Sequence, residues 1–177
     1  MKCYARRFNL YLLLLGAGLL AVAGCKTGGD SDKQTASLRI YLENRAQVIG
    51  SGQTVSVLRT SPVLVTINSE PALTEANIIA ATVLTTPGGY AIEVKFDEMG
   101  TLMLEQFSAA NIGRHFAIFS QWSDKTIDSR WLAAPLIVHR IPNGLFSFTP
   151  DASLDEDKKI VRGLNNMAKK IAKGKMK

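Results

Sequence analysis

Cysteine and histidine are scarce in this chain of 177 residues, which holds two of each. Cys3 and Cys25 both lie near the amino terminus, so the rest of the sequence has no thiol for a disulfide, a thiolate metal site or a nucleophile. His115 and His139 lack a supported third ligand, so we interpret them as ordinary strand or surface residues rather than as a metal or catalytic pair.

Catalytic and nucleotide-binding motifs are also missing. The sequence has no Gly-x-Ser-x-Gly elbow, and Gly88-Gly89 follows a proline in a predicted hairpin rather than opening a helix as a phosphate loop does. We therefore predict that the protein is not an enzyme and uses no dissociable cofactor or metal. A cryptic hydrolase is the least favoured alternative.

Long apolar runs are absent apart from residues 10–22. These 13 residues are shorter than the roughly 20 needed to cross a bilayer, and they follow the basic residues Lys2, Arg6 and Arg7, as in a secretory signal. Residues 1–24 carry three basic and no acidic side chains, which leaves 18 basic and 15 acidic residues in the remainder. A net charge near +3 does not indicate a general nucleic-acid binder.

The apolar run ends in Leu-Ala-Val-Ala-Gly-Cys at residues 20–25, which resembles the lipobox of bacterial lipoproteins. The resemblance implies cleavage between Gly24 and Cys25, a diacylglyceryl group on the Cys25 thiol, and acylation (palmitate, for example) of the new amino terminus. The alternatives are an uncleaved anchor and an ordinary signal peptide with a chance cysteine. Lys26 resembles the outer-membrane default of Gram-negative lipoproteins, so we expect a lipid-anchored cell-envelope protein on the periplasmic face of that membrane.

After cleavage, 153 residues would remain, enough for one domain with a real core. Residues 25–36 contain the lipidated cysteine and a stretch without large apolar side chains, which predicts a flexible tether. We expect a single α+β domain over residues 37–172 and a basic, frayed tail over 173–177.

Alternating and β-branched patterns predict several strands. Residues 37–43 alternate, with Leu38, Ile40 and Leu42 on one face. Strands are also expected near 55–57 and 63–67, in a hairpin of 78–84 with 90–96, and in 114–122, 131–141 and 145–149. In the hairpin, Tyr90, Ile92, Val94 and Phe96 are expected to face inward, and Ala91, Glu93 and Lys95 outward.

Two helices interrupt the strands. Asp97 can cap the first, whose predicted apolar stripe is Met99, Leu102, Met103, Phe107 and Ala110, and Asn111-Ile112-Gly113 ends it. Ser153-Leu154-Asp155-Glu156 fits a capping box for the second. Asp155, Glu156 and Asp157 are interpreted as charges at a helix start rather than as a carboxylate site.

Four segments of residues 62–172 together resemble the head subdomain of the first periplasmic region of SecD and SecDF, membrane proteins of protein export. They are Pro71-Ala72-Leu73-Thr74 with 78–84, then Phe96 to Gly100 with Phe107 and 111–113, then 114–119 with Ala134-Pro135-Leu136-Ile137, and finally 141–144 with 151–164. Arg130-Trp131-Leu132-Ala133 departs from the short polar approach of that family.

This resemblance implies an α+β fold, with a mostly antiparallel sheet and two helices packed on one face, and contact with extended or unfolded polypeptide. It marks Gly100, Asn111, Gly113, Pro135 and Gly144 as motif residues with a structural role. SecD has six membrane helices and this chain has none after cleavage, so the resemblance does not imply export-motor activity.

Two surfaces are candidates for partner contact. Trp122, Arg130 and Trp131 flank a polar loop and would form an aromatic interface if exposed, although a core role is the favoured interpretation for the tryptophans. The basic end of the last helix would contact anionic lipid or, as the favoured alternative, be a solvated face. We predict a lipid-anchored envelope module that binds protein or peptide, or alternatively a structural accessory subunit of an envelope membrane complex.

Overall fold

The computed structural model describes residues 34–44, 52–123 and 126–175. The predicted signal peptide, its cleavage site at Gly24 and Cys25, and most of the tether lie outside these residues. The elements are β1 (Thr35–Leu42), β2 (Gly52–Val57), β3 (Val63–Asn68), β4 (Leu73–Thr74), the short 3-10 helix η3 (Glu75–Asn77), β5 (Ile78–Thr86), β6 (Gly89–Phe96), α2 (Glu98–Ala110), β7 (Phe116–Ser123), β8 (Ile127–Ala133), β9 (Leu145–Phe148) and α3 (Leu154–Lys175).

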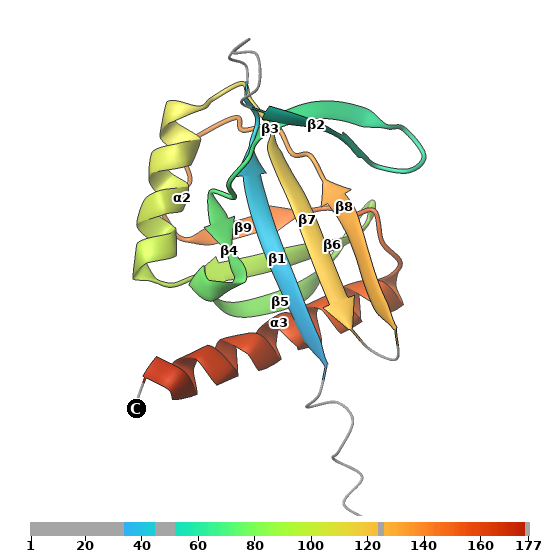
Figure 1. The fold of residues 1–177 in the computed structure, drawn as a ribbon, viewed down its shortest axis with the longest axis vertical. Coiled ribbons are helices and arrows are strands. Elements are labelled where there is room, and N and C mark those ends of the chain that lie inside the picture. The colour runs from blue at the N-terminus through green and yellow to red at the C-terminus, as the bar shows by residue number, and fades with distance from the viewer. Residues whose placement is uncertain (1–33, 45–51, 124–125, 176–177) are drawn as a thin grey trace, which may run out of the picture. The chain divides into compact units, whose positions relative to one another are not determined.

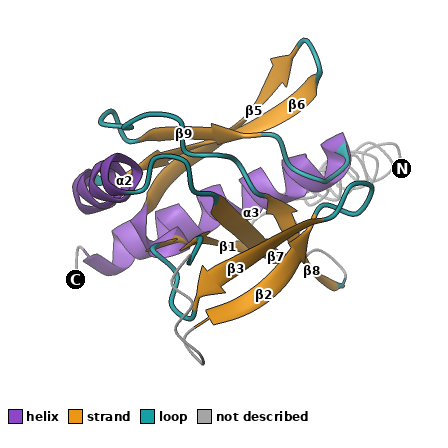
Figure 2. Cartoon of the chain, turned by 90° about the horizontal axis from the view of Figure 1, so that it is seen from above, coloured by secondary structure: helices purple, strands orange, loops and turns teal. Residues whose placement is uncertain are grey.

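The described strands form three antiparallel sheets, ordered β4-β1-β7-β8, β2-β3 and β5-β6-β9. The predicted α+β class with two helices is confirmed, and the strands divide among three sheets instead of forming one. Figure 1 shows the long strands β1, β7 and β8 side by side. Figure 2 shows β5, β6 and β9 on one side of α3 and β1, β7 and β8 on the other.

The main core fills the space between the two larger sheets and α3. The predicted alternation in β1 is confirmed, because Leu38, Ile40 and Leu42 are buried there. Ile160 and Leu164 of α3 are 0% and 1% exposed and belong to the same cluster. Burying such side chains contributes about 1.5–3 kcal/mol each, so the amphipathic face of α3 is a main source of stability.

A second, smaller core lies on the opposite face of the β1-β7-β8 sheet. Val55, Val57, Val65 and Ile67 of the β2-β3 pair are buried together with Ala117 of β7. The β2-β3 ribbon thus covers part of a sheet face that would otherwise expose apolar side chains.

Helix α2 begins and ends as predicted, but the face that it buries differs in part. The Asp97 carboxylate accepts from the Gly100 N–H at 2.8 Å, and Asn111 is the C-cap. The predicted apolar stripe is confirmed for Met103 and Phe107, which pack against the main core, and wrong for Met99 and Leu102, which are 61% and 59% exposed. The buried residues of the helix are Gly100, Leu104 and Ser108. Small residues face the core because the helix backbone lies close to its neighbours: a Cβ at Gly100 would come within 2.8 Å of the Asn77 Cβ.

Other boundaries and orientations also differ from the predictions. The predicted strand 131–141 ends at Ala133, and residues 134–144 form an irregular segment after it. Tyr90 is exposed and Ala91 is buried, which reverses the prediction at that end of β6. The first strand starts at Thr35, inside the predicted tether, and α3 continues to Lys175, into the predicted frayed tail.

Candidate functional site

Strand β9 is an edge of its sheet. Among the described strands it pairs with β6 alone, with Leu145 opposite Lys95 and Ser147 opposite Glu93. On its outer side the Leu145 N–H donates to the Asn143 Oδ1 at 3.1 Å. The Phe96 N–H donates to the Gly144 carbonyl at 2.9 Å, which fixes the alternation of the antiparallel pair. Backbone groups of Leu145 and Ser147 therefore point away from β6. Among the described residues, no backbone hydrogen bond reaches Ser147 from that outer side.

A cavity of about 410 Å³ runs along β9. Its lining residues are Phe116, Leu145, Phe146 and Ser147 together with residues 135–143. Leu136, Val138 and Leu145 are 50%, 64% and 37% exposed, so apolar side chains are open to solvent around it. An open strand edge beside an apolar cavity is the arrangement by which domains bind an extended peptide as an added strand. We refer to the β9 edge and this cavity as the β9 groove.

Residues 135–143 form the wall of the cavity opposite β9, and contacts with residues distant in the sequence hold this wall in place. The Gly113 N–H donates to the Ile137 carbonyl at 2.8 Å, and the Phe116 N–H donates to the Pro135 carbonyl at 3.0 Å. The Ile141 N–H donates to the Ser108 Oγ at 2.9 Å, and Arg140 forms an ion pair with Glu105. Irregular backbone with this many anchors can keep a groove open without forming a strand of its own.

Four of the five motif residues, Asn111, Gly113, Pro135 and Gly144, lie in or next to the segments that form this groove, and Gly100 lies in α2 against Asn77. Gly113 and Pro135 supply the backbone contacts of the wall, and the Asn111 side chain donates to the Phe107 carbonyl at 2.9 Å, next to the turn. Gly144 has φ +67°, and a Cβ there would come within 2.1 Å of the Thr101 hydroxyl of α2, so this turn requires glycine.

Three other sheet edges carry contacts at single positions. At the outer edge of β5, the Asn165 Oδ1 of α3 accepts from the Ala81 N–H and its Nδ2 donates to the Ala81 carbonyl, both at 2.9 Å. The Asp151 N–H donates to the Leu132 carbonyl of β8 at 2.7 Å, and the Asn44 N–H donates to the Thr66 carbonyl of β3 at 2.7 Å. Each of these contacts occupies a backbone group that an added strand would otherwise use.

The two histidines lie in different settings. His115 is part-buried, and its Nδ1 lies 2.8 Å from the Glu43 Oε2. His139 is exposed and lines the β9 groove. Within the described part of the chain, no group of three or more histidine, cysteine, aspartate or glutamate side chains could hold a metal ion.

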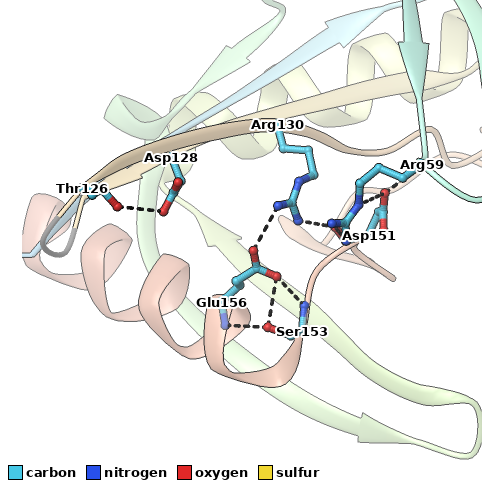
Figure 3. Close-up of polar contacts among 7 residues, drawn as sticks. All are labelled: Arg59, Thr126, Asp128, Arg130, Asp151, Ser153 and Glu156. Carbon is cyan, nitrogen blue, oxygen red and sulfur yellow. Dashed lines mark hydrogen bonds and ion pairs between the residues drawn. The ribbon is translucent and has the colours of Figure 1, made fainter.

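Of the predicted interface residues, Trp122 is buried and Arg130 is part-buried. Trp122 is 2% exposed, so an exposed contact role for it is wrong and the core interpretation is confirmed. The Arg130 guanidinium lies 5.6 Å from the centre of the Trp122 ring. It also donates to the Asp151 carbonyl at 2.9 Å and pairs with Glu156 at 3.0 Å (Figure 3). Arg130 therefore joins β8 to the start of α3.

Trp131 has a different position, on the sheet face that carries the β2-β3 ribbon. It is half-buried between Tyr41 and Phe119, with ring centroids 5.4 and 5.2 Å away. Sequence reasoning did not include Tyr41, which lies 90 residues earlier and reaches Trp131 only through the pairing of β1 with β7. These three residues form an aromatic row across β1, β7 and β8.

A polar cluster attaches the ribbon side of the domain to the start of α3 (Figure 3). The Arg59 guanidinium donates to both carboxylate oxygens of Asp151 at 3.0 Å, and this holds the pKa of Asp151 below its usual value. Burial raises the pKa of Glu156, but hydrogen bonds from Ser153 and Arg130 outweigh it, so the net shift is downward. The capping box of Ser153 and Glu156 is confirmed, with reciprocal bonds of 2.8 and 3.4 Å.

Asp157 departs from the predicted solvated helix start. It is 1% exposed, and its Oδ1 has no hydrogen-bond partner among the described residues. Burial, with a contribution from the neighbouring Glu156 charge, raises its pKa to about 6.

The geometry defines a class of protein: an α+β domain of antiparallel sheets and two helices, with an open strand edge beside an apolar groove. Residues 46–166 match the family model of the SecDF P1 head subdomain. The match covers more than half of the chain, which therefore belongs to this family. None of the curated proteins matches it.

Two solved structures have a similar fold. A structure of SecDF, described as a membrane component that enhances protein export, is 20% identical with a TM-score of 0.52, and the match covers 75% of this chain and 63% of that one. SecDF in a super-membrane-facing form is 19% identical with a TM-score of 0.53, covering 75% of this chain and 19% of that one. The chain thus spans less than two thirds of either structure. No helix in its described part has the length and apolarity needed to cross a membrane.

Proposed function

We propose that this protein is a non-enzymatic, lipid-anchored module of the cell envelope that binds extended polypeptide in the β9 groove. The observation that carries the proposal is the free outer edge of β9 beside an apolar cavity of about 410 Å³. Membership of the SecDF P1 head subdomain family supports an accessory role in protein translocation.

The chemistry of the groove favours an extended chain over a folded partner. A strand added to β9 would bond with the outward carbonyl of Leu145 and the outward N–H and carbonyl of Ser147, whatever the sequence of the ligand. Alternate side chains of that strand would lie against the apolar lining, which includes Phe116, Ile137 and Phe146. Such a site selects for unfolded segments rich in apolar residues.

Binding can be tested with a defined unfolded chain, reduced and carboxymethylated lysozyme, and with native lysozyme as the folded control. Ser147→Pro removes the outward N–H and fills the edge with a ring, while the β6-facing groups of Phe146 and Phe148 stay intact. Ser147→Ala keeps the N–H and is the matched control, since both variants lose the bond from Ser147 Oγ to Glu93.

We expect the wild type to bind the unfolded chain and not native lysozyme. Ser147→Pro should weaken the binding at least tenfold, and Ser147→Ala should leave it within about twofold. If circular dichroism shows that both variants are folded and their affinities for the unfolded chain are equal, binding at the β9 edge is contradicted.

The anchor is a separate part of the proposal. It rests on the lipobox-like sequence that ends at Cys25 and on the outer-membrane-like Lys26. Mass spectrometry of the mature amino terminus should find a diacylated or triacylated Cys25, and Cys25→Ser should abolish both the lipid and the cleavage. Retention of residues 2–24 on the mature protein would contradict both the anchor and the envelope location.

A structural accessory subunit of a membrane complex is the second candidate, favoured by the half-exposed aromatic row of Tyr41, Phe119 and Trp131. Trp131→Ala should then release the protein from its complex without changing the binding of unfolded lysozyme. Co-sedimentation of the variant with the same membrane complex as the wild type would exclude this surface.

A further inference from the structure

The carboxyl-terminal half of α3 carries lysines on an exposed surface. Lys169, Lys170 and Lys173 are all exposed, and no acidic residue occurs after Asp157. The acidic residues of α3 are confined to its first turn. With a rise of 1.5 Å per residue, that turn is roughly 18 Å away from the lysines.

The same part of α3 holds the point where the described chain begins. Gln34 is 8% exposed, its carbonyl accepts from the Asn166 Nδ2 at 3.0 Å, and its Oε1 accepts from the Arg162 guanidinium at 3.3 Å. Figure 1 shows the start of β1 beside α3, with the helix continuing past it to the carboxyl terminus. A chain arriving from the amino-terminal side therefore meets the domain at α3.

The length of the preceding chain limits how far α3 can lie from an anchor. Gln34 follows Cys25 by nine residues, which reach at most about 30 Å when fully extended. If Cys25 carries the lipid, as in the proposed function, α3 must stay within that distance of the bilayer. Charges act on each other within a Debye length of about 8 Å at physiological salt, so a chain of this length lets the lysines sample the range where they attract anionic headgroups.

We propose that Lys169, Lys170 and Lys173 form a docking surface for an anionic phospholipid bilayer, which sets the orientation of the domain on the membrane. Each lysine near such a surface strengthens binding about fivefold. Docking through α3 would keep the domain at the bilayer from which its tether arises. The β9 groove lies on other elements and would remain open to polypeptide.

The test uses residues 25–177 with Cys25→Ser, which retains the whole compact unit Ser31–Lys177 and removes the lipid. Binding is measured by co-sedimentation with vesicles of phosphatidylcholine alone or with 30% phosphatidylglycerol. The variant Lys169→Gln/Lys170→Gln/Lys173→Gln removes three charges from α3. The control Arg39→Gln/Lys95→Gln/Lys158→Gln removes three exposed charges outside the proposed surface, on β1, on β6 and near the start of α3.

We expect binding only to the anionic vesicles, a loss of about a hundredfold in the α3 variant, and a loss of no more than about fivefold in the control. Wild-type binding should also weaken between 50 and 300 mM salt. Equal losses in the two variants, or equal binding to both kinds of vesicle, would overturn the inference. Binding of unfolded lysozyme is measured without vesicles. A failure of the vesicle experiment therefore does not affect the test of polypeptide binding in the β9 groove.

Discussion

Neutralising Asp157 should make the protein more stable at neutral pH. Asp157 is 1% exposed in the first turn of α3, and in the described part of the chain nothing forms a hydrogen bond with its Oδ1. A charged carboxylate in that setting loses its hydration without gaining hydrogen bonds in return. Asp157→Asn keeps the shape of the side chain and removes the charge.

The size of the effect follows from the shift in pKa. Burial raises the pKa of Asp157 from 3.8 to about 6, so the folded state holds this proton more tightly than the unfolded state does. Between about pH 4 and pH 6 the folded state binds more protons, and stability must therefore fall as pH rises through this window. About two pKa units at 1.36 kcal/mol each correspond to roughly 3 kcal/mol. The free energy of unfolding of the wild type at pH 7 is lower by this amount than it would be with a neutral side chain at position 157.

Urea unfolding followed by tryptophan fluorescence at pH 4, 5, 6 and 7 measures this difference. Asp157→Asn and the wild type should have similar stability at pH 4, and the variant should be more stable by roughly 3 kcal/mol at pH 7. Asp155→Asn is the matched control, because it removes an exposed acid from the same turn and costs no more than about 1 kcal/mol of favourable helix-dipole interaction. Parallel pH profiles for Asp157→Asn and the wild type would refute the reasoning.

Two further predictions concern how the elements are joined. Gly163→Ala should destabilise the protein by about 1–3 kcal/mol in urea unfolding, because the added Cβ would lie 2.6 Å from the Ala36 nitrogen of β1. Gly174→Ala, which meets nothing within 4 Å, should be neutral or slightly stabilising, and equal losses in both variants would contradict a close contact between α3 and β1. Arg59→Ala should speed amide hydrogen exchange in β2 and β3 but not in α3, since it removes the bonds to Asp151; unchanged exchange in the ribbon would show that its small core alone holds it.

Local patterns predicted most of the elements because their causes lie within a few residues. The alternation of Leu38, Ile40 and Leu42 placed β1, and the cap at Asp97 and the box at Ser153 placed the helix starts correctly. Each of these signals depends only on local backbone geometry and on one buried face. It can therefore be recognised in the sequence without knowledge of the rest of the fold.

The buried face of α2 and the β9 groove depend on contacts between residues far apart in the sequence, and no local pattern contains these contacts. Helix α2 turns Gly100 and Ser108 inward, where Asn77 and the backbone of Ile141 approach it, whereas apolarity alone favoured a face that includes the exposed Met99 and Leu102. The residues predicted as a possible interface, Trp122, Arg130 and Trp131, do not line the groove, which forms where Gly113 meets Ile137.

The treatment of the sheet edges connects these observations to function. Groups from distant parts of the chain occupy single positions of two other edges, as Asn165 does at β5 and the Asp151 backbone does at β8. At β9, a turn that requires glycine at Gly144 and backbone anchors at Gly113 and Pro135 hold an irregular segment beside the edge, with the cavity lined by both. An open edge can pair with another chain. Strand addition by an extended polypeptide therefore fits both the outward backbone groups of β9 and the apolar lining.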